Sequence, residues 1–203
     1  SPRGRAGQLI GLCASEAKIV KYIDIPIQHI DDRILRRMNR RDTGESIRAL
    51  FKKLRERIPG LVLRTSLITG LPGEGEAEFE ELCEFLREAK IERAGVFPFS
   101  PEEGTPAARM EYPPKDVAME RAALVERLQA EVMDAWEGSL VGREVEAICD
   151  YIDGETGLAV GRSWFDSPGI DGGAVMEGEC EPGDIVTFRV ESAEDGVLRG
   201  RII

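Results

Sequence analysis

The side chains best suited to binding a small molecule lie close together in the sequence, between residues 28 and 40. Gln28 and His29 follow residues 22–27, where isoleucines alternate with polar residues or proline, the pattern of a strand. Arg40 follows a short segment of helical pattern. An amide donates and accepts hydrogen bonds toward hydroxyls, and a guanidinium binds a carboxylate with two parallel hydrogen bonds. We therefore expect a ligand-facing corner at the carboxyl end of this strand.

Each residue of this corner also has a second interpretation. His29 is the only histidine in the chain, so a histidine-rich metal site is excluded. Its ring either serves a structural or capping role or positions a substrate. Arg41 replaces Arg40 as the carboxylate-binding residue if the helix before them ends one residue later. As plain structure, Arg40 is a surface side chain and Gln28 a polar strand end.

Two further segments have the pattern of strands and carry polar or aromatic groups. Residues 61–69 form a nearly continuous apolar run that contains Arg64 and Ser66. Buried guanidinium and hydroxyl groups need hydrogen-bond partners, so this strand predicts either a ligand or a cross-strand salt bridge. The glycines of residues 70–75 do not make a phosphate loop, because they lack both Gly-Lys-Ser and Gly-x-Gly-x-x-Gly. Residues 93–99 form the third predicted strand.

These positions require a scaffold in which strands and helices alternate. Asp31 is placed to cap a short helix that runs through Met38, and Thr43 is placed to cap a longer amphipathic helix that runs to Ile58. Another amphipathic helix contains residues 79–89. The order strand, helix, strand, helix, strand predicts parallel strands with right-handed crossovers. Three such strands cannot close a barrel, so we expect the later part of an α/β barrel.

The character of the sequence changes after residue 138. A long amphipathic helix from Pro113 to about Trp136 is followed by short β-rich runs separated by Gly, Asp and Pro. Five such runs predict a small antiparallel barrel of OB-like kind. The expected fold class is therefore α/β plus all-β. We divide the chain into residues 1–138, part of a (β/α) barrel with a long linking helix, and residues 139–203, a small β-barrel domain.

The negative charge of the chain is concentrated in its last third. The formal net charge is −11, and residues 139–203 hold five Arg and no Lys against fourteen Asp and Glu. Such a surface repels phosphates and attracts basic proteins. Trp164, Phe165 and Phe188 would otherwise suit base stacking, but with so few cations they favour core or protein contacts. This argues against direct nucleic-acid binding and for a basic protein partner.

The cysteines and the hydropathy restrict the class further. Cys13, Cys83, Cys149 and Cys180 are too far apart for a zinc, redox or iron–sulfur motif. No apolar run reaches about 18 residues, and the first residues lack a signal-peptide pattern. We expect a cytoplasmic protein with reduced thiols and no membrane contact.

Several stretches together resemble one family. Residues 22–40 contain Tyr-x-Asp-x-Pro-x-Gln-His and Leu-x-x-Met-x-Arg, and residues 99–107 match Tyr-Ser-Pro-Glu-Glu-Gly-Thr-Pro-Ala except for Phe99 in place of Tyr. These phrases resemble the radical S-adenosylmethionine (SAM) methylthiotransferases. The Gln-His pair resembles the RimO type, whereas tRNA-modifying relatives show Gln-Ser-Gly. Residues 161–163, 170–172, 182–186 and 198–200 resemble the TRAM domain of these enzymes.

The resemblance implies a role for each candidate residue. The glutamine would bond near the SAM ribose, and the first arginine would meet the methionyl carboxylate. The second strand would contact ribose and adenine, and backbone groups around the phenylalanine would hold the adenine edge. His29 would help to position the substrate loop. The expected cofactor-binding residues are Gln28, Arg40, Arg64, Ser66, Ile68 and Phe97.

The resemblance also implies an activity. A RimO-type enzyme uses SAM and [4Fe-4S] clusters to add a methylthio group to the β-carbon of an aspartate in a small-subunit ribosomal protein. The chain lacks a Cys-x-x-x-Cys-x-x-Cys run. We therefore expect the cluster ligands in an upstream part of the same enzyme, an inactive isolated chain, and a TRAM domain that docks the basic substrate. The alternatives are a tRNA methylthiotransferase of the MiaB type and a non-catalytic interaction module.

Overall fold

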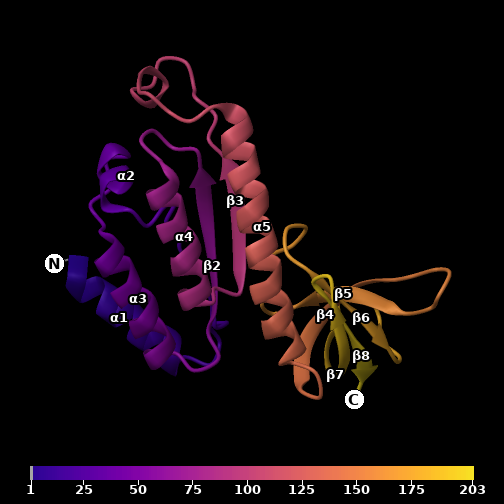
Figure 1. Ribbon diagram of the computed structural model, residues 1–203. Coiled ribbons are helices and arrows are strands. Elements are labelled where there is room, and N and C mark those ends of the chain that lie inside the picture. The colour runs from indigo at the N-terminus through magenta and orange to yellow at the C-terminus, as the bar shows by residue number, and fades with distance from the viewer. Residues whose placement is uncertain (1) are drawn as a thin grey trace. The chain divides into compact units, whose positions relative to one another are not determined.

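The computed structural model describes residues 2–203, with side chains from Gly7 onward. It divides into two compact units, which meet after Val132 inside one long helix. The elements of the first unit (Figure 1) are α1 Pro2–Ser15, β1 Tyr22–Asp24, α2 Asp32–Arg37, α3 Gly44–Arg57, β2 Val62–Thr69, α4 Glu76–Ala89, β3 Arg93–Pro98, the 3-10 turn η1 Ala107–Arg109 and the first turns of α5 Lys115–Gly138. The second unit continues with β4 Glu144–Ile152, β5 Ala159–Ser163, β6 Gly173–Glu177, β7 Ile185–Glu194 and β8 Val197–Ile202.

The first unit is built on a parallel sheet in the order β1-β2-β3. Helices α2 and α3 connect β1 to β2, and α4 connects β2 to β3, as the alternation of the sequence predicts. Strand β1 is shorter than the alternating pattern suggests, because Pro26 has no N–H to donate to a ladder. Pairing with β2 resumes at Gln28 as an isolated bridge to Leu67.

Helices α3 and α4 form their core against one face of β2. Thr43 and Ser46 close a capping box that starts α3. Phe51 of α3 and Phe85 of α4 meet edge to face with ring centroids 5.9 Å apart. Leu63 and Leu67 of β2 are fully buried in the same cluster. Each such side chain contributes about 1.5–3 kcal/mol by its removal from water.

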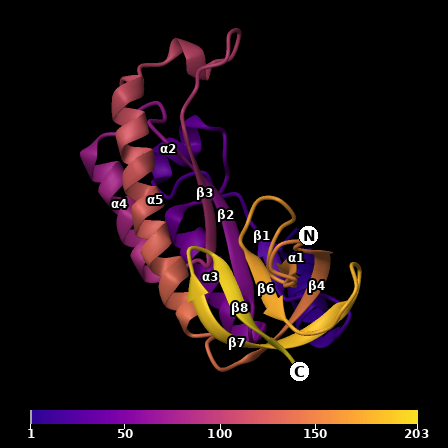
Figure 2. The ribbon, with the colours of Figure 1, turned by 90° about the vertical axis from the view of Figure 1, so that its right-hand side faces the viewer.

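The opposite face of the sheet is more open than the helical side. Arg64, Ser66 and Ile68 are only half-buried, while their neighbours along β2 are buried. A three-stranded sheet therefore presents one polar face, as expected for part of a barrel. Figure 2 shows the three strands in the order β3, β2, β1 from left to right.

The second unit is a closed five-stranded barrel in the order β4-β5-β6-β8-β7. Its core contains Phe165 and Phe188, and the Trp136 ring packs edge to face on Phe165 with centroids 4.9 Å apart. A Cβ on Gly161 would collide with the carbonyl of Ile148, so this close strand contact requires glycine. The barrel is not purely antiparallel as predicted, because β6 and β8 pair in parallel. Among the described residues, no helix is both long and apolar enough to cross a membrane.

Candidate cofactor site

The polar face of β2 brings three of the predicted residues together. Arg64, Ser66 and Ile68 alternate along the strand, so their side chains lie on the same face of the sheet. The parallel register sets Ile68 beside Phe97 of β3 and Ser66 beside Gly95. The face carries a guanidinium and a hydroxyl, then an apolar side chain and an aromatic ring toward the carboxyl ends of the strands.

A pocket of about 280 Å³ lies at these strand ends. Phe97 on its wall is 57% exposed, a large apolar surface left open to a ligand. The volume is near the lower limit of about 300 Å³ for ligand pockets, so it suits one planar ring of a larger molecule. The residues therefore fit the adenine portion of SAM. The pocket is lined by Ile68, Phe97, Pro98, Phe99, Ser100, Glu102, Thr105 and Ala107.

Gln28 lies directly beside the end of β2. Its backbone N–H donates to the Ser66 carbonyl at 2.9 Å, and its carbonyl accepts from the Ile68 N–H at 2.9 Å. Its φ of 69° is in the left-handed region, which costs a residue with a Cβ about 1–2 kcal/mol. Backbone strain of this kind persists where surrounding contacts enforce it. The structure thus brings Gln28 to the same strand end as Ser66 and Ile68.

Arg40 reaches back toward the same corner from the segment after α2. The helix ends at Arg37, and Asn39 then turns the chain with a φ of 57°. The Arg40 Nη2 donates to the Pro26 carbonyl at 2.8 Å, two residues before Gln28. This bond uses one of the five guanidinium donors and leaves the others for a ligand.

Arg64 forms a cross-strand ion pair, the alternative that the sequence left open. Its Nη1 lies 2.8 Å from Oδ2 of Asp24, the residue paired with it in the β1–β2 register. The Arg64 side chain is 14% exposed and that of Asp24 is 42% exposed. The pair fixes the guanidinium on the polar face, and a cofactor contact of Arg64 stays a prediction.

His29 is fully buried behind this corner and does not reach the open face. Its Nδ1 accepts from the Asp31 N–H at 3.1 Å, and its Nε2 lies 3.4 Å from Oε2 of Glu74. Any influence of His29 on a substrate would have to pass through neighbouring residues. Its role in substrate positioning stays a prediction.

Glu74 and Arg121 are residues that sequence reasoning did not assign to the site. Glu74 Oε1 accepts from the Gly70 N–H and from Arg121 Nη1, both at 2.9 Å. Burial raises the pKa of the Glu74 carboxyl, but hydrogen bonds from His29, Gly70 and Arg121 outweigh it and hold the pKa below 4.5. An arginine within the apolar stripe of the long helix was the available signal.

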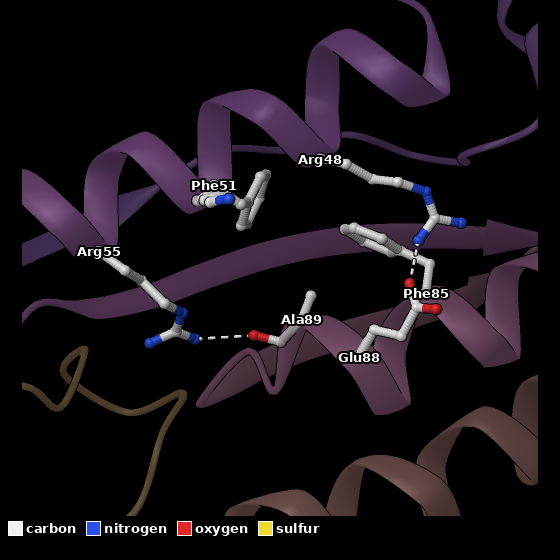
Figure 3. A pocket seen from close by; sticks show the side chains of 7 residues that line it. Arg48, Phe51, Arg55, Phe85, Glu88 and Ala89 are labelled. Carbon is white, nitrogen blue, oxygen red and sulfur yellow. Dashed lines mark hydrogen bonds and ion pairs between the residues drawn. The ribbon is translucent and has the colours of Figure 1, made fainter.

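The larger groove between α3 and α4, about 310 Å³, is a weaker candidate. Figure 3 shows Arg48 directed toward Glu88 and Arg55 toward the Ala89 carbonyl, with Phe51 and Phe85 between them. Both guanidinium groups are thus already engaged within the protein. Among the described residues, no group of three His, Cys, Asp or Glu side chains could hold a metal ion.

Comparison with known proteins agrees with this geometry. The Radical SAM superfamily matches residues 13–86, and the TRAM domain matches residues 141–203. Proteins named ribosomal protein uS12 methylthiotransferase RimO are 43% identical in an Anaeromyxobacter species, 44% in Geobacter sulfurreducens and 42% in Myxococcus xanthus. Each of these matches covers the whole chain but 44%, 46% and 43% of the relative, so the chain spans less than half their length.

One solved structure matches over a part of the chain. Coproporphyrinogen III oxidase HemN from Escherichia coli, described as a radical SAM enzyme, is 20% identical with a TM-score of 0.47. The match covers 55% of this chain and 27% of that one.

Proposed function

From a chain that combines radical SAM and TRAM sequence and is related over its full length to the RimO methylthiotransferases, we propose the following function. The chain is part of a cytoplasmic radical SAM enzyme that adds a methylthio group to the β-carbon of an aspartate in a small-subunit ribosomal protein. The observation that carries this proposal is 40–44% identity over the whole chain to proteins of that name.

In this proposal the strand ends of the first unit bind SAM. The adenine lies against Ile68 and Phe97, and the ribose hydroxyls meet Gln28 and Ser66. Arg40 binds the methionyl carboxylate, and Arg64 borders the ribose from its ion pair with Asp24. When bound, SAM and the clusters supply the radical and methyl-transfer chemistry, and the protein supplies orientation.

The clusters are proposed to be [4Fe-4S] clusters held by cysteines outside this chain. The four cysteines here are scattered, with Cys13, Cys83 and Cys149 buried and Cys180 half-buried. The chain alone would bind no cluster and would be inactive. A full-length protein that binds no iron would point instead to a non-catalytic interaction module.

The TRAM domain is proposed to dock the basic substrate protein. Three of its five arginines are already paired with carboxylates, in Arg162–Asp150, Arg189–Glu144 and Arg201–Glu177. The remaining acidic residues of residues 139–203 outnumber the remaining arginines. A surface of this sign is complementary to a basic ribosomal protein.

The experiment that tests the function compares two substrates. Full-length protein reconstituted with clusters is incubated with SAM, a reductant, a sulfur source and either the isolated small-subunit ribosomal protein or bulk tRNA. We expect mass spectrometry to find a methylthio group on one aspartate of the protein and none on tRNA. Because OB-like barrels often bind RNA, modification of tRNA alone would establish the MiaB-type alternative.

A further inference from the structure

A buried polar network lies directly behind the proposed SAM corner. Glu74, in the loop after β2, stands at its centre with a side chain that is 0% exposed. Its Oε1 accepts from the Gly70 N–H at 2.9 Å, and Arg121 of α5 donates to both its Oε1 and its backbone carbonyl. Its Oε2 faces Nε2 of His29, 3.4 Å away. The network therefore joins the segment after β1, the segment after β2, and α5.

The contacts of His29 determine where its proton lies. Nδ1 accepts a hydrogen bond from the backbone N–H of Asp31, so that nitrogen carries a lone pair. The neutral ring then carries its proton on Nε2, which faces the Glu74 carboxylate. A fully buried ring held at both nitrogens has one orientation.

The residue before His29 is the one that pays for an unusual backbone. Gln28 has a φ of 69° although it is not glycine, and its N–H and C=O both bond to β2. A strained conformation needs neighbours that over-determine it. His29 supplies such an anchor immediately along the chain, because its ring cannot move without breaking its contacts with Asp31 and Glu74.

We infer that His29, locked by Glu74, is a positioning residue that holds Gln28 in its left-handed conformation and so aims the Gln28 amide at the bound SAM. This inference deepens the proposed function and rests on it. His29 touches neither cofactor nor substrate, and it acts only through Gln28.

The test is a double-mutant cycle in the full-length, cluster-loaded protein, with the SAM dissociation constant measured by calorimetry. His29→Asn keeps an acceptor for the Asp31 N–H but has no atom that reaches Glu74, and we expect it to raise the dissociation constant at least tenfold. His29→Gln places a donor near Glu74 and should limit the increase to about threefold. In a Gln28→Ala background, His29→Asn should add less than twofold, because coupled residues are not additive.

A matched control separates positioning from stability. Gln129 is also buried and donates to the Ile91 carbonyl at 2.8 Å, before the other end of β3. Gln129→Leu should lower the melting temperature and leave SAM binding unchanged. If His29→Asn does not fold, Glu74→Gln provides the same comparison, because it keeps an acceptor for Gly70 and turns a donor toward Nε2.

The outcomes distinguish this inference from the function on which it rests. Full multiplicative effects of Gln28→Ala and His29→Asn, or unchanged SAM affinity in His29→Asn, overturn the positioning role. If Gln28→Ala also leaves SAM affinity unchanged, or the wild-type protein does not bind SAM, the proposed cofactor site fails as well.

Discussion

Arg40 is the residue whose removal should separate cofactor binding from folding. Within the protein its guanidinium makes one hydrogen bond, to the Pro26 carbonyl, and the side chain is half-buried. Loss of a hydrogen bond to a charged ligand costs about 1.5–3 kcal/mol. We predict that Arg40→Ala in the full-length enzyme weakens SAM binding by that amount in calorimetry, with little change in melting temperature. Arg41→Ala is the control, and the opposite ranking of the two variants would move the role to Arg41.

Glu74 gives a prediction about pH. Its pKa in the folded protein lies below 4.5, because hydrogen bonds outweigh the opposing effect of burial. A group with a lowered folded pKa contributes stability above its unfolded pKa, and that contribution is lost as the pH falls through the folded value. We predict that Glu74→Gln destabilises the protein at pH 7 by about 3–5 kcal/mol. The difference should shrink below pH 4.5 in urea unfolding, and an equal difference at pH 3 and 7 would contradict this assignment.

The residue-level site was predictable only where backbone pattern decides it. Ile68 and Phe97 could be placed together because both stand near the ends of parallel strands. The burial of His29 and its contact with Glu74 depend on packing between distant segments, which no local pattern records. The ion pair of Arg64 with Asp24 required the register of β1 on β2, so the sequence offered it only as one of two readings.

At the scale of elements, the two arginines of the α3–α4 groove do different work (Figure 3). Arg55 donates to the Ala89 and Lys90 carbonyls, which end α4, and to Glu92, which also accepts from the Leu63 N–H. Arg48 pairs mainly with Glu88, whose side chain is 67% exposed. One arginine thus ties α3 to the end of α4 and to β2, while the other makes a surface pair.

The two arginines should therefore differ in their contribution to stability. We predict that Arg55→Ala lowers the free energy of unfolding by about 2–3 kcal/mol, the scale of hydrogen bonds to charged groups. Arg48→Ala should cost about 1 kcal/mol or less, as exposed ion pairs do. Chemical denaturation of both variants checks this, and equal losses would contradict the structural role given to Arg55.

Most elements of the first unit follow from periodicity, and the exceptions have physical causes. Thr43 and Pro59–Gly60 bound α3 in the sequence, and the helix is found between them. The alternating residues 22–27 suggested a longer β1, but Pro26 interrupts its ladder. In the barrel, strand existence was readable from turn residues, whereas the parallel pairing of β6 with β8 depends on closure, which alternation does not encode.

For the whole molecule, we propose that the TRAM domain folds independently and includes the last turns of α5. The structure divides the chain after Val132, whereas the change in composition comes at residue 138. Trp136 packs on Phe165 at 4.9 Å, and aromatic pairs add about 0.5–1.5 kcal/mol beyond their buried area. A fragment of residues 133–203 should therefore melt at a higher temperature than one of residues 139–203. Equal melting temperatures would favour the later boundary.

The charge of the TRAM domain makes the last prediction. Glu146, Glu155 and Glu191 are exposed and lie outside its three arginine–carboxylate pairs. Replacing all three by Lys in the full-length enzyme should weaken binding of the basic ribosomal protein at least tenfold at low salt, because it reverses an attractive field, and the loss should shrink as salt screens it. SAM affinity should not change. The control changes the charge equally in the first unit, at the exposed residues Glu45, Glu56 and Glu84. If both triple variants lose substrate affinity equally, the net charge of the enzyme and not its TRAM surface attracts the substrate.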